Sequence, residues 1–198
     1  MKVLPRRFYQ RDPRHVAPEL LNKVLVRGDR AGRIVEVEAY VGGIDPAAHG
    51  YRGRTARNAT MFGPPGHLYV YFSYGMHWCC NPVCGDDGEG VAVLLRALAP
   101  VRGIDDMRAV RPAAKRDRDL CNGPARLTQA LGITGVDDGA DLVTGDRGIT
   151  IVDDGLSPPD DPVCTPRIGI TRAASEPWRW YVRGDMNVSR PLWPKPRD

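Results

Sequence analysis

Apolar residues along the chain recur at two spacings, which predict a few short helices and many short strands. Helical spacing follows Asp12 over residues 14–23, and recurs at 104–110 and at 125–131, where Gly132 ends the pattern. Alternating or continuous apolar positions predict strands, at residues 24–27, 33–41, 68–72, 91–98, 148–152, 167–171 and 180–183. Few helices among many short strands are typical of an α+β fold with an antiparallel or mixed sheet, and we expect one domain over residues 1–198.

The predicted strand 33–41 has two different faces. Its odd-numbered positions from Val35 to Val41 are apolar and should pack on the core, because side chains alternate between the faces of a strand. Glu36, Glu38 and Tyr40 share the other face. This pattern fits either an ordinary solvated face or a site that presents two carboxylates and a tyrosine together.

Residues 42–67 lack periodicity and read as a long ordered loop, a kind of segment that often carries function. The loop holds a basic cluster of Arg52, Arg54 and Arg57. His49 stands near its start and is a candidate site residue, although a lone histidine is more often structural.

Aromatic residues are concentrated in residues 68–81, which read as two strands joined by a tight turn at Tyr74-Gly75-Met76. A tyrosine at such a turn is either part of a packed aromatic hairpin or an exposed platform for bases. Arg96 interrupts the apolar strand 91–98 and therefore needs an anionic partner or an opening. A structural salt bridge and an active-site contact both satisfy that need.

Composition narrows the class of protein only slightly. The net charge is +4, and only four of the 28 basic residues are lysines. Arginine suits contacts with phosphates and bases, but a GC-rich genome produces the same bias. The five cysteines fit no zinc-binding spacing, so we expect packed, reduced thiols and no metal or cofactor. No apolar run is long enough to span a bilayer or to act as a signal peptide, which makes a cytoplasmic location the default expectation.

Several blocks of sequence, in order over nearly the whole chain, closely resemble the alkyladenine (3-methyladenine) DNA glycosylase family. The blocks are Glu36-Val37-Glu38-Ala39-Tyr40, Ala47-Ala48-His49, Arg57-Asn58, Met61-Phe62, Pro65 to Tyr71, Tyr74-Gly75-Met76, Val93 to Leu98, Leu120 to Pro124 and Trp180 to Gly184. The resemblance implies a compact α+β domain with a curved sheet, similar to the C-terminal domain of methionyl-tRNA formyltransferase.

The resemblance also implies roles for individual residues. Glu38 matches the family's general base, which activates the attacking water, and Arg96 matches an arginine beside that water. Tyr40, His49, Tyr71 and Asn81 match the base pocket, and Tyr74 matches the tyrosine inserted into the duplex. We also expect Met76 to take part in intercalation beside Tyr74, and the basic cluster of Arg52, Arg54 and Arg57 to contact the DNA backbone.

The expected protein is a monofunctional base-excision repair glycosylase that flips an alkylated or deaminated purine from duplex DNA. We expect a bacterial, nucleoid-associated monomer with no membrane partner. Glu36 competes with Glu38 as the catalytic carboxylate, and only the resemblance decides between them. The alternative functions are a non-catalytic module that binds tRNA or DNA and a hydrolase of free nucleosides. Neither alternative needs both Glu38 beside Tyr40 and an aromatic ring at an exposed turn.

Overall fold

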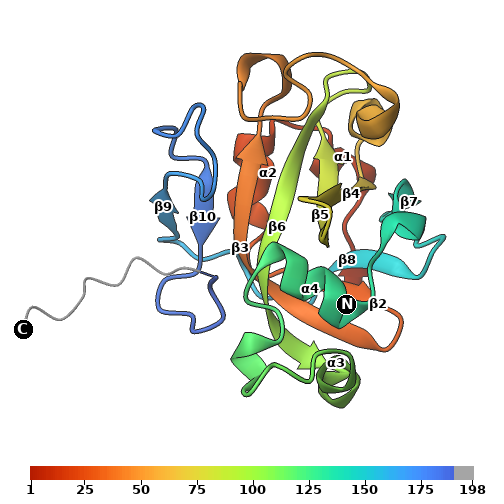
Figure 1. Cartoon of the computed structure of the whole chain (residues 1–198), viewed down its shortest axis with the longest axis vertical. Helices are drawn as coiled ribbons and strands as arrows, with labels where there is room; N and C mark the ends of the chain where they lie inside the picture. Colours follow the sequence, from red (N-terminus) through yellow and green to blue (C-terminus); the bar gives the residue numbers. More distant parts are fainter. Residues whose placement is uncertain (190–198) are drawn as a thin grey trace, which may run out of the picture.

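The computed structural model describes residues 1–189 and forms an antiparallel sheet with short helices around it (Figure 1). The strands are β1 (Lys2–Val3), β2 (Val24–Arg27), β3 (Arg30–Tyr40), β4 (His67–Ser73), β5 (His77–Cys84), β6 (Val91–Arg102), β7 (Ala140–Asp141), β8 (Ile149–Asp153), β9 (Val163–Thr165) and β10 (Arg179–Tyr181). The helices are α1 (Arg6–Tyr9), α2 (Pro13–Leu20), α3 (Ile104–Val110) and α4 (Pro124–Leu131), with 3₁₀ turns at Gly42–Ile44, Ala56–Phe62, Asp117–Asp119 and Gly135–Asp137. The predicted α+β class is confirmed.

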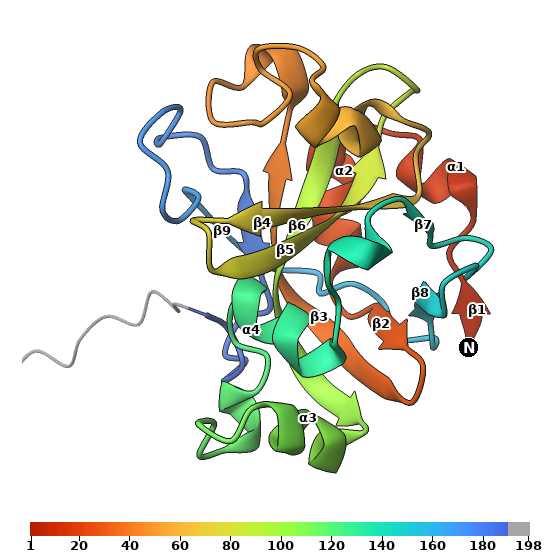
Figure 2. The ribbon, with the colours of Figure 1, turned by 45° about the vertical axis from the view of Figure 1, so that its right-hand side comes forward.

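The long strands β3 and β6 form the centre of the sheet. The strand order is β1-β8-β2-β3-β6-β5-β4-β7, and β10 pairs with β3 and carries β9 at its outer edge. The sheet is strongly curved, so that the β4–β5 hairpin crosses in front of β3 and β6 in the view of Figure 2. This curvature brings the tip of the hairpin towards the segment that joins β9 to β10 (Figure 2).

Helix α2 covers one face of the sheet because its apolar positions recur at helical spacing. Val16, Ala17 and Leu20 are fully buried, and the side chain of Asp12 caps the helix by accepting a hydrogen bond from the Arg14 N–H. The helix packs on β3 and β6. It ends at Leu20, three residues earlier than predicted, and residues 21–23 lead directly into β2.

Two of the three register shifts in the β3–β6 pair, those on either side of Glu36, change which side chains face the core. Val35 is an extra residue on β3, because Ile34 pairs with Leu98 while Glu36 pairs with Ala97. Arg96 is an extra residue on β6, because the next pair is Val37 with Leu95. The prediction that Val35 shares a face with Val37 is therefore wrong: Val37 lies in the main core, whereas Val35 packs in a separate cluster with Tyr181.

Other local predictions differ from the structure at segment ends. The β2–β3 turn is tighter than expected and lies at Gly28-Asp29, where Gly28 has a positive φ of 55°. Residues 167–171 form no strand; β9 lies earlier, at Val163–Thr165, where no strand was predicted. Segment 166–177 instead lies between β9 and β10 and contributes to the cavity described below.

The cysteines are mostly buried thiols. Cys79, Cys80, Cys84 and Cys121 are buried and unbridged, and Cys164 is exposed. Within residues 1–189, no group of three or more His, Cys, Asp or Glu residues is arranged to hold a metal ion. In the same residues, no helix has the length and apolarity needed to cross a membrane.

Candidate active site

A cavity of about 530 Å³ opens where the curved sheet, the long loop and segment 166–177 meet. Such a volume lies in the usual range for ligand pockets, roughly 300–1,000 Å³. The cavity brings together residues that are far apart in the sequence and that the sequence singled out, namely Tyr40, His49, Arg57, Tyr71, Tyr74, Asn81 and Arg96. Met76, Arg52 and Arg54 are outside its lining.

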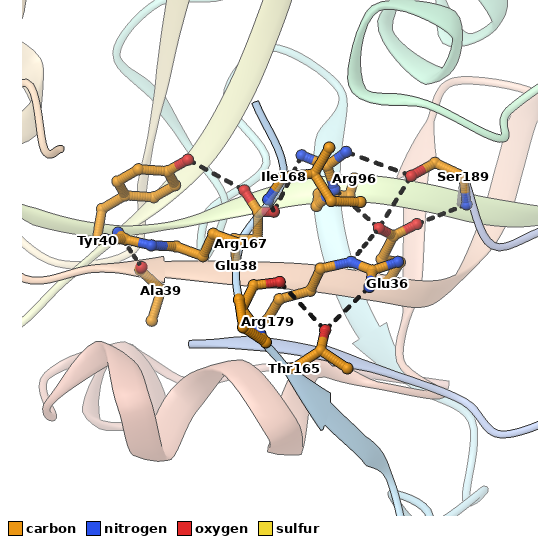
Figure 3. Close-up of polar contacts among 11 residues, drawn as sticks. Glu36, Glu38, Ala39, Tyr40, Arg96, Thr165, Arg167, Ile168, Arg179 and Ser189 are labelled. Atoms are coloured by element: carbon orange, nitrogen blue, oxygen red, sulfur yellow. Dashed lines mark hydrogen bonds and ion pairs between the residues drawn. The ribbon is translucent and has the colours of Figure 1, made fainter. Parts of the chain in front are cut away.

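Glu38 lies directly behind the wall of this cavity. Its side chain is fully buried and does not itself line the cavity, but three cavity-lining residues contact its carboxyl group (Figure 3). Tyr40 donates its hydroxyl to Oε2 at 3.0 Å, the Ile168 N–H donates to Oε1 at 2.8 Å, and Arg96 Nη1 lies 3.1 Å from Oε1. Desolvation by burial raises the pKa of Glu38 above its ordinary value, although Arg96 and the two hydrogen bonds oppose the shift.

Glu36 has a different environment from Glu38, although both carboxyl groups are buried. Its Oε1 accepts hydrogen bonds from Arg96 Nε and Arg179 Nε, both at 2.8 Å, and its Oε2 accepts one from the Ser189 N–H at 2.6 Å. Burial raises the pKa of Glu36, but the two arginines and Ser189 outweigh it and hold the pKa below its ordinary value. The environment of Glu36 therefore favours its ionised form, whereas Glu38 is the carboxyl group whose affinity for protons is raised.

Arg96 has both an anionic partner and an opening, the two surroundings that its sequence position allowed. Its guanidinium bridges Glu36 and Glu38 as a buried ion-pair network, and it also lines the cavity. The bulge at Arg96 explains this geometry, because an extra residue on β6 turns its side chain to the same side as both glutamates. Figure 3 shows the guanidinium reaching from Glu38 to Glu36 and Ser189.

Aromatic and imidazole rings form part of the cavity wall, beside the charged side chains of Arg57 and Arg96. Tyr69 and Tyr71 stack with ring centroids 5.4 Å apart, and His49 meets Tyr71 edge-on at 4.4 Å. Burial, together with nearby Arg57, lowers the pKa of His49, so the imidazole is uncharged at neutral pH. Burial also raises the pKa of Tyr69 to about 12 and raises that of Tyr40 and Tyr71. The pocket thus offers uncharged rings to a ligand.

Tyr69 was not among the predicted site residues, although it lines the cavity and contacts His49. Its hydroxyl lies 3.1 Å from His49 Nδ1 and fixes the imidazole ring. Alternation along β4 places Tyr69 on the same face as Tyr71, which is a signal that the sequence contained. Asn81, on the paired strand, donates its side-chain amide to the Tyr69 carbonyl at 3.1 Å.

The β4–β5 turn presents an exposed aromatic ring at the mouth of the cavity. Tyr74 is 86% exposed and Met76 is 66% exposed. Tyr74 has φ 50° and Gly75 has φ 66°, and the Met76 N–H donates to the Ser73 carbonyl at 3.1 Å. Two successive positive φ angles match a type I′ turn, which favours Asn-Gly over Tyr-Gly. The ring at the tip is therefore exposed and not packed in the hairpin, and its positive φ is a strained conformation for a tyrosine.

The three arginines of the long loop do not have the same environment. Arg52 and Arg54 are exposed. Arg57 donates from Nη2 to the Phe72 carbonyl at 2.9 Å and lines the cavity, so it also fastens the loop to the hairpin.

Segment 166–170 supplies contacts that the sequence did not reveal. The backbone N–H of Ile168 reaches Glu38, and residues 168–170 form one side of the cavity. A backbone donor leaves no mark in the sequence, because every residue except proline carries one. Arg179 and Ser189, which hold Glu36, were likewise not predicted as site residues.

Comparison with known proteins gives consistent matches over the whole fold. The family described as methylpurine-DNA glycosylase matches residues 7–186. A protein of Burkholderia lata named "Putative 3-methyladenine DNA glycosylase" is 64% identical over 191 residues, covering 96% of this chain and 92% of the relative. Proteins with the same name from Rhodopseudomonas palustris and Streptomyces avermitilis are 50% and 46% identical, and they cover 96% and 94% of this chain and 91% and 90% of their own length.

Proposed function

Because the chain belongs to the methylpurine-DNA glycosylase family, we propose that its cavity holds a damaged purine flipped from duplex DNA while Glu38 activates the water that displaces it. The protein is a DNA glycosylase of base-excision repair. The observation that carries the proposal for the site is a buried carboxyl group of raised pKa directly behind an aromatic cavity.

Release of the base requires one bond to break and one to form at the sugar C1′. The N-glycosidic bond breaks with its electron pair leaving on the purine, and positive charge develops on the sugar. Water attacks C1′ and gives its proton to Glu38, which must be ionised to accept it. Within the described residues, Glu38 Oε2 accepts one hydrogen bond, from Tyr40, so an acceptor position remains for water.

The water approaches Glu38 between the three residues that both line the cavity and contact the carboxyl group, namely Tyr40, Arg96 and Ile168. The guanidinium of Arg96 orients the water and favours the ionised form of the carboxylate, against the effect of burial. Glu36 has no such access, since two arginines and Ser189 occupy its oxygens.

The flipped base stacks on the aromatic walls. Tyr40, His49, Tyr69 and Tyr71 have rings that line the cavity, and the Tyr69 hydroxyl contacts His49. Stacking of about 1–3 kcal/mol per base offsets the cost of about a few kcal/mol for unstacking the nucleotide. Uncharged rings favour a purine that carries a positive charge after alkylation, because a cation is attracted to the face of an aromatic ring.

The exposed ring of Tyr74, with Met76 beside it, fills the space that the flipped nucleotide leaves in the duplex. Replacing Tyr74 with asparagine is expected to relieve strain, because asparagine tolerates a positive φ, and to keep or raise the melting temperature. Base release from duplex DNA should nevertheless fall by about tenfold or more, since about a few kcal/mol of unstacking is no longer compensated. A lesion in single-stranded DNA, compared in the same assay, should be released as by the wild-type protein. Equal loss on both substrates would contradict the wedge role.

Arg52 and Arg54 contact phosphates of the DNA backbone in this proposal, and Arg57 does so while holding the hairpin. Replacing Arg52 and Arg54 together with alanine should reduce the slope of log affinity against log salt by about 1 for each phosphate that is no longer neutralised. Fluorescence anisotropy with duplex DNA at several salt concentrations measures this slope. A matched control removes the same charge at Lys2 and Arg7, which are exposed at the N-terminal edge of the fold. An equal change in both variants would show that only net charge matters.

One domain carries all of these parts, and we propose that it acts as a monomer on DNA in the bacterial nucleoid. The test is a panel of duplexes that each bear one lesion, 3-methyladenine, 7-methylguanine, hypoxanthine or ethenoadenine, followed by alkaline cleavage at abasic sites. Strand breaks at a lesion, in a duplex-dependent reaction, support the proposal. Tight binding without breaks would favour the non-catalytic nucleic-acid-binding module, and equal action on free nucleosides would favour a nucleoside hydrolase.

A further inference from the structure

One buried arginine stands at the start of the segment that covers Glu38. The side chain of Arg167 is fully buried, and so is that of its ion-pair partner Asp45. Arg167 donates from Nη1 and Nη2 to the two carboxylate oxygens of Asp45 at 2.6 and 2.8 Å, and from Nη1 to the Ala39 carbonyl at 3.0 Å. A single guanidinium thus joins segment 166–170 to the end of β3 and to the long loop.

The same guanidinium lies between two aromatic rings. It is 4.6 Å from the ring centroid of Tyr40 and 5.0 Å from that of Trp178. Figure 3 shows Arg167 beside the Tyr40 ring, next to Ile168 in the chain. Because Tyr40 lines the cavity and donates to Glu38, the stack fixes a ring that belongs to both the pocket and the catalytic group.

Asp45 connects Arg167 to the part of the pocket wall that the long loop forms. Its carboxylate also accepts hydrogen bonds from the N–H groups of Val41 and Ala47, at 3.2 and 3.0 Å. These bonds shape the turn that leads to Ala47 and His49, both of which line the cavity. Neither Arg167 nor Asp45 lines the cavity itself.

We propose that Arg167 is a positioning residue that sets the place of Glu38 relative to the base pocket. Arg167 precedes Ile168 in the chain, so fixing Arg167 keeps the Ile168 N–H on the Glu38 carboxyl group. Its contacts with Tyr40 and Asp45 hold the parts of the pocket wall against which the base stacks. The proposal rests on the role proposed above for Glu38. It predicts that loosening Arg167 changes the chemistry at Glu38 and does not merely weaken the fold.

The readout that separates these two effects is the pH dependence of base release. A hydrogen bond donated to a carboxylate favours its ionised form, so removing the hydrogen bond from the Ile168 N–H raises the pKa of Glu38. The base must be ionised, so the acid limb of the rate profile moves to higher pH. The other titratable or charged groups that face Glu38 are Glu36 and Tyr40 on β3 and Arg96 on β6, with Arg179 on β10 acting through Glu36, and none of these side chains is replaced in the variants.

The experiment compares Arg167→Lys and Asp45→Asn with the wild-type protein. Lysine keeps the charge but cannot reproduce the two-pronged hydrogen bonding or the planar stack. Asp45→Asn loosens Arg167 from the other side, because it removes the charge that the guanidinium pairs with. Both variants are compared with the wild-type protein at a temperature at which circular dichroism shows that they are folded. Arg33→Lys is the matched control, because Arg33 also donates two hydrogen bonds to an aspartate, Asp154, and one to a backbone carbonyl, away from the cavity.

Single-turnover release is measured from pH 5 to pH 8 on the lesion duplex that the wild-type protein cleaves fastest. For Arg167→Lys and Asp45→Asn we expect about a tenfold lower rate at the acid end, a smaller loss at the alkaline end and an acid limb at higher pH. Arg33→Lys should keep the wild-type profile. If both test variants keep the wild-type pH profile while Glu38→Gln is slow, the role proposed for Arg167 is overturned and that of Glu38 stands. A fast Glu38→Gln variant would overturn the role of Glu38 and, with it, that of Arg167.

Discussion

Replacing Glu38 with glutamine is expected to abolish base release while the protein still folds and binds lesion DNA. A glutamine accepts no proton from water, so the rate should fall by about 10²–10⁴-fold, the usual contribution of a general base. Glutamine fits the site, because its carbonyl oxygen can accept from Ile168 and Arg96, and its amide can donate to the Tyr40 oxygen. Single-turnover kinetics and anisotropy on the same lesion duplex measure the two properties.

The same variant is expected to be more stable than the wild-type protein at neutral pH. The pKa of Glu38 is higher in the folded protein than in the unfolded chain, because burial penalises its charge. Folding therefore opposes ionisation above that pKa, and this cost vanishes below the unfolded pKa of about 4. The gain in melting temperature should be present near pH 7.5 and absent near pH 3.5. A variant that releases the base at the wild-type rate would remove Glu38 as the base.

Replacing Arg96 with methionine is expected to destabilise the fold more than any other change in the site. Arg96 neutralises Glu38 and shares the neutralisation of Glu36 with Arg179. Breaking a buried ion pair from one side leaves an uncompensated charge and costs about 3–5 kcal/mol in the free energy of unfolding. Urea denaturation should show a larger loss at pH 7.5 than at pH 5.0, because a protonated Glu38 needs no counter-charge.

A double variant tests the cause of that loss. If the unpaired charge of Glu38 is responsible, adding Glu38→Gln to Arg96→Met should recover much of the lost stability. If the effects of the two single changes on the free energy of unfolding simply add, the loss is instead assigned to packing of the Arg96 side chain. Base release should be lost in both the single and the double variant.

The hydrophobic pattern predicted most of the strands but not the two bulges that build the site. Strict alternation placed Val35 with Val37, whereas the extra residue on β3 turns Val35 away from the main core. A bulge leaves little trace in a pattern of apolar residues, because both sides of this strand are buried. The same feature explains why Arg96 interrupts an apolar strand and still finds two carboxylates.

The candidate residues that carry distinctive side chains could be found from the sequence, and those that act through the backbone could not. Tyr40, His49, Tyr71 and Arg96 come together at one cavity, as the resemblance implied. Ile168 contributes its backbone N–H, a group that every residue except proline carries, so the sequence does not reveal it. Its segment was predicted as a strand because 167–171 alternates, but the chain there follows the cavity wall instead.

The spacing of Glu36 and Glu38 along the strand did not show which of them is suited to accept a proton, but their surroundings in the fold distinguish them. Both lie on β3, two residues apart, and both are buried. Glu36 is surrounded by Arg96, Arg179 and Ser189, which favour its charge, whereas burial dominates at Glu38 and raises its pKa. Only the folded arrangement distinguishes a structural carboxylate from one suited to accept a proton.

The most direct test is the pH dependence of single-turnover base release by the wild-type protein and by Glu38→Gln on one lesion duplex. If Glu38 is the base, the wild-type rate rises with pH along an acid limb whose midpoint lies above the ordinary pKa of a glutamate, and the residual rate of the variant shows no such limb. A flat wild-type profile, or the same limb in the variant, would contradict the assignment of Glu38 as the group that activates water.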